Sequence, residues 1–269
     1  MHAIVCIKQV PDTTDVKIDP ERGTLIREGV PSIVNPFDMY AIEEGVRLKE
    51  TYGGQTTALT MGPPQARDAL KEAVAMGCDK GVLLSDRAFA GADTWATAYT
   101  LAQAIRRMGA FDIVLCGRQA ADGDTGQVGP GIATQLSISQ LTYVFKIREI
   151  DFQAQTITVE RLVEEGREVV TSSLPCVVTV VKDINEPRYP SFLGIRKANR
   201  MEYPVWSVED LCAATGADEA CFGLIGSPTK VIAVFTPPPR QGGCDMIPAD
   251  DLAQAADALS DKILAEKIL

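Results

Sequence analysis

The chain has 269 residues, enough for one large domain and a smaller appendage, and its 46% hydrophobic and 23% charged residues are typical of soluble globular proteins. A formal net charge of −10 without a run of basic residues argues against a nucleic-acid partner. Seven cysteines without a Cys-x-x-Cys pair, and His2 as the single histidine, argue against zinc sites and cysteine-rich iron–sulfur motifs, so no metal site is expected. The sequence predicts no membrane span and no signal peptide, and the free thiols indicate a cytoplasmic protein.

Short β-rich segments alternate with helical patterns through the first half of the chain. Strands are expected at 2–10, 55–61, 80–85 and 111–116, and helices at 39–51, 64–76 and 93–108. This alternation predicts an α/β fold of Rossmann-like type, with a mostly parallel sheet flanked by helices. Ligands of such folds bind at the carboxyl ends of the strands.

The segment 116–130 is the most informative part of the chain. It follows an apolar strand, contains Gly123, Gly126 and Gly129, and leads into a helical pattern with Ile132, Leu136 and Ile138. Glycines let the backbone approach a ligand closely, and free N–H groups at a helix start attract phosphate. Asp122 and Asp124 would repel phosphate, so they are expected to cap N–H groups or to accept hydrogen bonds from ribose hydroxyls. An ordinary strand-to-helix connection with capping aspartates explains the pattern equally well.

The pattern changes after residue 142. Strands at 143–150, 156–162 and 168–172, with a turn at 164–167, predict a small antiparallel section, and a last buried strand is expected at 176–181. The loop at 185–193 follows with two prolines and the adjacent apolar residues Phe192 and Leu193, which are costly to leave in water unless something covers them.

The chain ends in an expected linker at 236–243 and an amphipathic helix at 249–267. A loop, linker and helix of this kind indicate docking on another chain. Packing of the same segments onto their own domain explains them equally well.

Six segments in order carry a family resemblance. They are IVCIKQVP at 4–11, VNPFD at 34–38, MGP at 61–63, AMGCD at 75–79, GRQAADGDTGQVG at 117–129 and NEPRY at 185–189. Together they closely resemble the beta subunits of electron transfer flavoproteins, over essentially the whole chain. The resemblance implies an adenine-nucleotide-binding domain at 1–182. It also implies that 183–269 form a recognition loop and a C-terminal arm and helix, which dock on an alpha subunit that carries FAD.

The resemblance assigns a nucleotide site to strand ends and loops. It places Cys6 beside the adenine, the loop 35–38 over the nucleoside, Met61 at the same rim, and 119–130 at the ribose and phosphate. The expected cofactor-binding residues are Cys6, Asn35, Pro36, Phe37, Asp38, Met61, Asp93, Thr94, Thr97, Arg118, Gln119, Asp122, Gly123, Asp124, Thr125, Gly126, Gln127, Val128 and Gly129. The alternatives are that Cys6 and Cys116 are small core residues and that Asn35-Pro36 is a plain turn.

Phe192 occupies the position at which the family places an apolar anchor, usually leucine, for a pocket on a partner dehydrogenase, and Leu193 follows it. Either residue could be the anchor. The resemblance implies an acyl-CoA dehydrogenase-like or other flavin dehydrogenase as the partner.

The stretch 85–98, the segment 9–12, and Arg118 before Gln119 resemble one branch of the family. That branch holds a second FAD in the beta subunit and bifurcates electrons from NADH, which implies ferredoxin or flavodoxin as a further acceptor. Gly91 and the helix start at Asp93 and Thr94 could receive a pyrophosphate, or Asp93 or Thr94 could be a plain N-cap. The alternative function is an electron carrier that holds AMP as a structural nucleotide. Enzymatic activity of the chain therefore stays open, and no side chain is expected as a catalytic acid, base or nucleophile.

Overall fold

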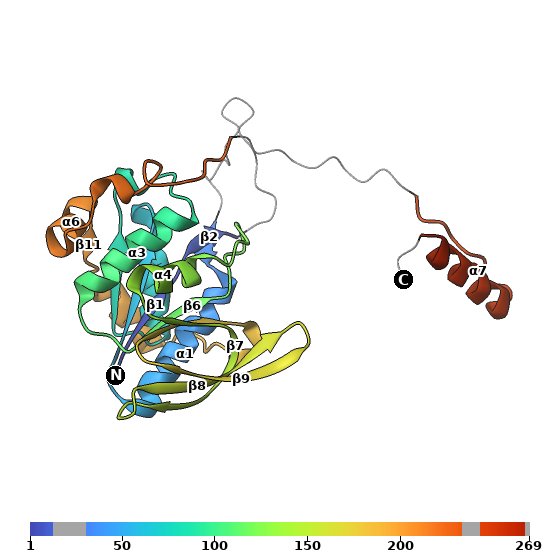
Figure 1. The fold of residues 1–269 in the computed structure, drawn as a ribbon, viewed down its shortest axis with the longest axis horizontal. Coiled ribbons are helices and arrows are strands. Elements are labelled where there is room, and N and C mark those ends of the chain that lie inside the picture. The colour runs from blue at the N-terminus through green and yellow to red at the C-terminus, as the bar shows by residue number, and fades with distance from the viewer. Residues whose placement is uncertain (13–30, 233–242, 267–269) are drawn as a thin grey trace. The chain divides into compact units, whose positions relative to one another are not determined.

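The computed structural model describes residues 1–12, 31–232 and 243–266 of the chain (Figure 1). The chain divides into two compact units, Met1–Ala233 and Val234–Leu269. Residues 236–242 of the predicted linker lie outside the described residues, and only position 243 is described. Position 267 of the predicted final helix also lies outside them.

The first unit is built on a nine-stranded sheet in the order β11-β5-β4-β1-β6-β10-β7-β8-β9. The strands on the parallel side are β1 (His2–Cys6), β4 (Gln55–Met61), β5 (Lys80–Leu84), β6 (Ile113–Gly117), β10 (Cys176–Val180) and β11 (Val205–Trp206). The central strand β1 is apolar on both faces, and its residues Ala3, Ile4 and Val5 are fully buried, as expected for a sheet covered on both sides. The predicted mostly parallel α/β fold is confirmed.

Helices cover both faces of this sheet. They include α1 (Pro36–Tyr52), α2 (Arg67–Met76), α3 (Thr94–Met108) and α4 (Val128–Leu136). Because successive residues of a strand point to opposite faces, Val5 and Leu115 pack in one core cluster with α1 and α2. Ile4 and Val114 pack in a second cluster with α3 and α4, which lie side by side in Figure 1.

Local signals set the ends of these helices. Helix α1 begins at Pro36, earlier than the predicted residue 39, because proline fits the first helical turn, and it ends at Gly53 with φ 72°. A 3₁₀ turn, η1 (Pro64–Ala66), fills the start of the helix predicted at 64–76. Helix α4 ends at Ser137, which has the left-handed φ of 57°, so Ile138 lies outside the helix.

The strand predicted at 2–10 is wrong as a single element. Strand β1 ends at Cys6, and β2 (Gln9–Pro11) pairs instead with β3 (Ser32–Val34) in a separate antiparallel sheet. The chain leaves the main sheet at Lys8, whose backbone N–H donates to the carboxylate of Asp38, 2.7 Å away. A side chain from α1 thus takes the hydrogen bond that would have continued the ladder.

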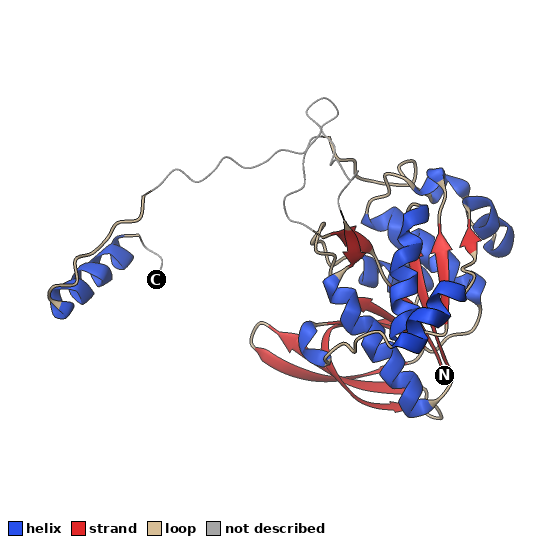
Figure 2. Cartoon of the chain, turned by 180° about the vertical axis from the view of Figure 1, so that it is seen from behind, coloured by secondary structure: helices blue, strands red, loops and turns tan. Residues whose placement is uncertain are grey.

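The predicted antiparallel section is formed by β7 (Ser139–Asp151), β8 (Thr156–Val163) and β9 (Gly166–Ser173). These strands lie together at one edge of the sheet, which is seen from behind in Figure 2. Strand β7 begins earlier than predicted because its first residues pair in parallel with β10 before the strand turns outward.

The segment after residue 182 contains structure that the sequence analysis did not predict. Helix α5 (Phe192–Arg200) packs on α2, β11 adds to the sheet beside β5, and α6 (Val208–Thr215) packs on α3. Short 3₁₀ turns, η2 (Arg87–Phe89), η3 (Lys182–Ile184) and η4 (Glu219–Cys221), complete the unit. The compact unit therefore extends past the predicted domain boundary at residue 182, and docking of 183–269 on a second chain stays a prediction.

The second unit contains α7 (Leu252–Ala265), close to the predicted helix at 249–267. Asp251 caps it by accepting from the N–H groups of Ala253 and Gln254, and Lys262 pairs with Asp245 at 2.6 Å. Helix α7 buries none of its side chains within this unit. Across the part of the chain with described structure, no helix combines the length and apolar character needed to cross a membrane.

Candidate functional site

The topology places a crevice at the carboxyl ends of β1 and β6. After β1, the strands β4 and β5 add to one side of it in the sheet. Helix α3 then crosses back, and β6 pairs with the other side of β1. The loops after β1 and β6 therefore leave in opposite directions. Open α/β sheets bind ligands at such a switch point, and the predicted cofactor-binding residues gather around this one.

Asp38 ties the two strand ends together. Its side chain is buried, and its two oxygens accept from the backbone N–H groups of Lys8 at 2.7 Å and Gly117 at 3.2 Å. A Cβ at Gly117 would lie 2.3 Å from an Asp38 oxygen and 2.7 Å from the backbone of Phe37, so only glycine allows α1 this close to β6. Asp38 therefore supports the floor of the crevice.

Asn35 holds the glycine-bearing loop after β6. Its buried side chain donates to the carbonyl of Gln119 at 2.8 Å and accepts from the N–H of Ala121 at 3.0 Å. The segment predicted as a loop at 35–38 is the start of α1, with Asn35 at the N-cap. The side chains of Asn35 and Asp38 both bond to backbone groups of the protein itself, and their contact with a cofactor stays a prediction.

The two aspartates of the glycine-bearing loop are engaged within the protein. Lys8 pairs with Asp122 at 2.5 Å, and the side chain of Asp124 accepts from Gln119. Asp124 and Gly126 have φ values of 55° and 63°, which turn the loop back toward α4. Pairing with Lys8 and hydrogen bonding from Gln119 reduce the repulsion that these carboxylates would exert on a phosphate.

The starts of α3 and α4 converge beside this loop. The hydroxyl of Thr94 donates to the side chain of Gln127 at 2.8 Å, which joins the two helix starts directly. Gln127 is the N-cap of α4 and makes no side-chain capping bond, so its side chain does not satisfy the N–H groups of Val128 and Gly129. The close packing of α4 requires Gly131, whose Cβ would lie 2.7 Å from Ala98 of α3.

Asp93 caps α3, as one of the two sequence interpretations predicted. One carboxylate oxygen accepts from the N–H of Ala96 at 3.0 Å, and the backbone of Thr97 donates to the Asp93 carbonyl at 2.9 Å. Thr97 is half-buried one turn into the helix. Asp93 thus occupies the N–H of Ala96, and the hydroxyl of Thr94 is engaged with Gln127.

Cys6, Cys116 and Met61 end β1, β6 and β4 at the same rim of the sheet. Cys6 and Cys116 are register partners, and each is only 7% exposed. A hydrogen bond with Cys6 together with burial raises the pKa of Cys116 above its ordinary value. These thiols therefore behave as small core groups, and their contact with a nucleotide stays a prediction. Among the residues whose structure is described, no three His, Cys, Asp or Glu side chains cluster as metal ligands do.

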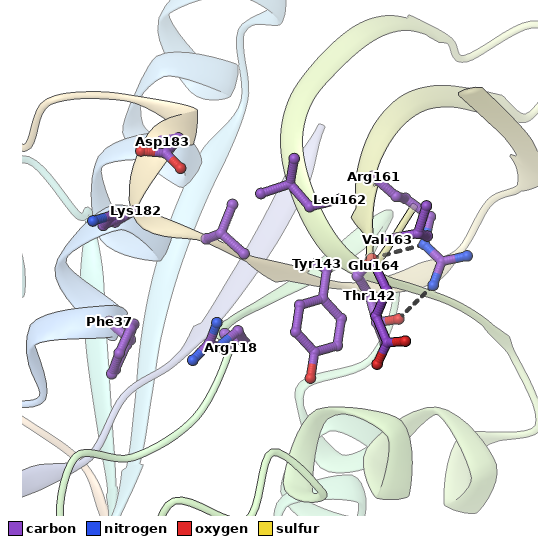
Figure 3. Close-up of a pocket in the computed structure, with 11 residues that line it drawn as sticks. Phe37, Arg118, Thr142, Tyr143, Arg161, Leu162, Val163, Glu164, Lys182 and Asp183 are labelled. Atoms are coloured by element: carbon purple, nitrogen blue, oxygen red, sulfur yellow. Dashed lines mark hydrogen bonds between the residues drawn. The ribbon is translucent and has the colours of Figure 1, made fainter. Parts of the chain in front are cut away.

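A cavity of about 800 Å³ adjoins the crevice (Figure 3). Its lining includes Phe37 at the start of α1, Arg118 after β6, Tyr143 on β7 and Lys182 after β10. The Arg118 guanidinium lies 5.4 Å from the ring centroid of Phe37 and 5.6 Å from that of Tyr143. Sequence analysis did not identify Tyr143 as a residue of this site. Its left-handed φ of 58° interrupts the regular alternation of side chains along β7. Sequence analysis also missed Lys8, although a lysine directly after a buried strand was a signal for this site.

Phe192 and Leu193 lie on another surface of the first unit. They were predicted in a loop but form the first turn of α5, where they are 81% and 73% exposed. Ser191 caps this helix by accepting from the N–H of Gly194 at 2.9 Å. A Cβ at Gly194 would lie 2.2 Å from the carbonyl of Ala75, so the helix start is held tightly against α2.

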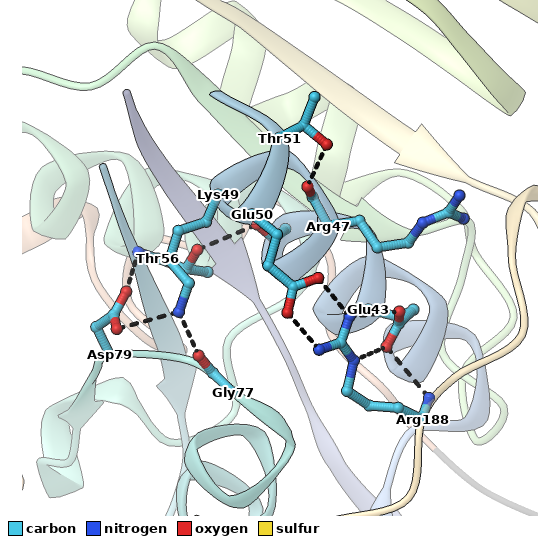
Figure 4. A network of polar contacts seen from close by, with 10 residues as sticks. Glu43, Arg47, Lys49, Glu50, Thr51, Thr56, Gly77, Asp79 and Arg188 are labelled. Atoms are coloured by element: carbon cyan, nitrogen blue, oxygen red, sulfur yellow. Dashed lines mark hydrogen bonds and ion pairs between the residues drawn. The ribbon is translucent and has the colours of Figure 1, made fainter. Parts of the chain in front are cut away.

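Arg188 anchors the chain that leads into α5 (Figure 4). Its guanidinium pairs with Glu43 at 2.8 Å and with Glu50 at 2.6 Å, both on α1. Asn185 donates to the carbonyl of Tyr40 at 3.1 Å in the same helix. These contacts attach the segment that precedes Phe192 and Leu193 to α1.

The titration of Asp38 gives the site a testable pH dependence. Burial raises the pKa of Asp38 from 3.8 to about 7, against the opposing hydrogen bonds of Asn35, Lys8 and Gly117. The folded protein thus binds this proton more tightly than the unfolded chain does. The resulting stabilisation is fully present below about pH 4 and is lost as the pH rises through about 7.

The asparagine of an Asp38→Asn variant cannot titrate, so only the unchanged protein loses this stabilisation as the pH rises. The free energy of unfolding of the variant, relative to that of the unchanged protein, is therefore expected to rise by up to about 3 kcal/mol between about pH 5 and about pH 8. The measurement is the midpoint of thermal unfolding of both proteins across this range. A constant difference between the two midpoints would contradict the raised pKa, whatever the offset that the substitution itself introduces.

The chain is similar to known proteins over its whole length. A family model described as the electron transfer flavoprotein domain matches residues 22–211. The chain is 49% identical to the electron transfer flavoprotein subunit beta of Megasphaera elsdenii, over the full length of both. It is 48% identical to the caffeyl-CoA reductase-Etf complex subunit CarD of Acetobacterium woodii, again over both full lengths. It is 46% identical to the protein FixA of Azorhizobium caulinodans, over 99% of this chain and 93% of that protein.

Proposed function

The chain belongs to the electron transfer flavoprotein family as a beta subunit, and on this basis we propose that its strand-end site holds a second FAD. As a beta subunit it pairs with an alpha subunit, which in this family carries the other FAD. When bound, the second FAD would take hydride from NADH and pass electrons to the alpha-subunit FAD and to ferredoxin or flavodoxin. The alternative is a carrier that holds AMP in the same site.

The observation that carries this proposal is the junction of two helix starts, where the hydroxyl of Thr94 donates to the side-chain oxygen of Gln127 at 2.8 Å. A single helix start suffices for the one phosphate of AMP, whereas a pyrophosphate has two phosphate groups to satisfy. The start of α4 supplies the N–H groups of Val128 and Gly129, and the start of α3 adds the hydroxyl of Thr94 beside them. This pairing favours FAD over AMP.

The residues around the site have distinct roles in this proposal. Thr94, Thr97 and the first turn of α4 at Val128 and Gly129 bind the pyrophosphate. Asn35 and Asp38 hold the loop and strand ends that shape the crevice. Lys8 and Gln119 engage the loop carboxylates, which permits an anionic ligand beside them.

The exposed start of α5 is proposed to dock on a flavin dehydrogenase. One relative belongs to a caffeyl-CoA reductase complex, by its name, and this supports an acyl-CoA dehydrogenase-like partner for the present chain. Phe192 and Leu193 provide the apolar surface for that contact, and Arg188 fixes its base on α1.

The flavin content of the purified alpha–beta complex tests the proposal. We expect about two FAD and no AMP per heterodimer after acid release and chromatography, and NADH should bleach both flavins. One FAD and one AMP per heterodimer would contradict the second-flavin site and leave the carrier function. The count requires no knowledge of the dehydrogenase partner.

A further inference from the structure

The segment 223–229 is fastened to the start of α3 by side chains that the proposed FAD site does not use. One carboxylate oxygen of Asp93 accepts from the backbone N–H of Thr229 at 3.0 Å and from its hydroxyl at 2.8 Å. The N–H of Asp93 in turn donates to the hydroxyl of Ser227 at 2.8 Å, and that hydroxyl donates to the carbonyl of Gly223 at 2.7 Å. Three bonds thus join residues more than 130 positions apart.

Backbone contacts reinforce this junction. The N–H of Leu224 donates to the carbonyl of Ala90 at 3.1 Å. A Cβ at Gly223, which has a φ of 57°, would lie 1.9 Å from the carbonyl oxygen of Ala88. Glycine is therefore required where the two segments meet, and the turn that leads into α3 is held along its length.

Asp93 serves both sides of the junction at once. Its first oxygen caps α3 through Ala96, and its second oxygen is held by Thr229. Desolvation raises the pKa of Asp93, but hydrogen bonds from Ala96 and Thr229 outweigh it and lower the pKa overall. The carboxylate therefore stays ionised at neutral pH and keeps both sets of bonds.

We propose that Ser227 and Thr229 are positioning residues of the nucleotide site, because they fix Asp93 and with it the first turn of α3. The proposal rests on the second-FAD function, since that function makes the start of α3 a phosphate ligand through Thr94. The segment 223–229 lies near the end of the first unit in the chain, which extends to Ala233. Binding of FAD at α3 and attachment of this segment are consequently coupled, and by linkage each strengthens the other.

Thr229→Val tests the coupling because valine keeps the shape of threonine and loses the hydroxyl. Thr229→Ser keeps the hydroxyl and is the conservative variant. Thr215→Val is the matched control, since the Thr215 hydroxyl bonds only within its own helix, to the carbonyl of Leu211 at 2.9 Å. Ser227→Ala removes the other bond to Asp93 and serves where Thr229→Val yields no complex.

Two measurements on the alpha–beta complex are needed. The first is amide hydrogen exchange of 91–97 in the complex stripped of nucleotide, which should be faster in Thr229→Val and unchanged in Thr229→Ser and Thr215→Val. The second is titration of the stripped complex with FAD. The dissociation constant of the beta-subunit site should rise about threefold to tenfold in Thr229→Val, with the alpha-subunit site unaffected.

The two measurements separate this inference from the proposed function. If the native complex holds AMP, the second-FAD function fails, and the exchange result still decides whether Thr229 fixes the start of α3. Equal exchange of 91–97 in Thr229→Val and the unchanged protein would overturn the positioning role. So would a Thr229→Ser variant that behaves like Thr229→Val, because the hydroxyl would then be irrelevant.

Discussion

Replacing Phe192 and Leu193 together by alanine is expected to weaken binding of the alpha–beta complex to its dehydrogenase partner by about 100-fold or more. Buried apolar anchors contribute about 2 kcal/mol or more each to an interface, and 1.4 kcal/mol corresponds to tenfold in affinity. Both side chains are largely exposed in the present chain, and they project from a helix start that is already ordered. Ordering in advance reduces the entropy lost on binding.

Calorimetric titration with the partner measures this effect. NADH oxidation with an artificial acceptor should stay intact in the same variant, because neither residue belongs to the strand-end crevice. Val169→Ala is a suitable control, since Val169 is a 52% exposed apolar residue on β9 and does not belong to α5. Unchanged partner affinity in the double variant would refute the role of α5 as the docking surface.

Features that depend on short-range patterns were predicted well. The apolar runs that end at Cys6, Met61 and Cys116 identify three neighbouring parallel strands, because a buried strand must be apolar on both faces. The glycine-bearing loop and the capping residue Asp93 are also local signals, readable from the residues that immediately follow a strand or precede a helix.

Features that depend on distant partners were not predictable from one sequence. The end of β1 is set by Asp38, a residue 30 positions away that binds the N–H of Lys8. The partner of Asp122 is Lys8, which lies 114 positions earlier. The first two residues of α5, Phe192 and Leu193, were predicted in a loop because the order of this helix start depends on packing against Ala75 of α2. Such contacts form only once the sheet has brought the loops together.

The segment after residue 182 illustrates the same limit. Strand β11 is only Val205–Trp206, too short to show the alternation that marks a strand, yet it pairs with Leu83 and Leu84 of β5. The Arg107 guanidinium also lies 4.4 Å from the ring of Trp206. The structure of the segment after residue 182 thus depends on contacts with residues earlier in the chain, which a local sequence pattern cannot show.

Replacing Thr94 and Thr97 by leucine is expected to empty the second-FAD site while the alpha-subunit FAD stays bound. Leucine at position 94 removes the hydroxyl that bonds Gln127, and both leucines place apolar bulk where the pyrophosphate would lie between the two helix starts. A phosphate left without these donors should bind about 100-fold more weakly, so flavin content should fall from about two FAD per heterodimer to about one.

Flavin release and ferredoxin reduction measure the outcome of the Thr94 and Thr97 changes. Reduction of ferredoxin by NADH should be lost, while dithionite should still reduce the remaining flavin. Thr51→Leu is the matched control, because Thr51 is exposed at the far end of α1 and its hydroxyl bonds only the carbonyl of Arg47. Retention of both flavins in the double variant would show that the start of α3 does not bind the pyrophosphate. The convergence of α3 and α4 would then be a packing feature alone, and the second FAD would bind at the strand ends without the start of α3.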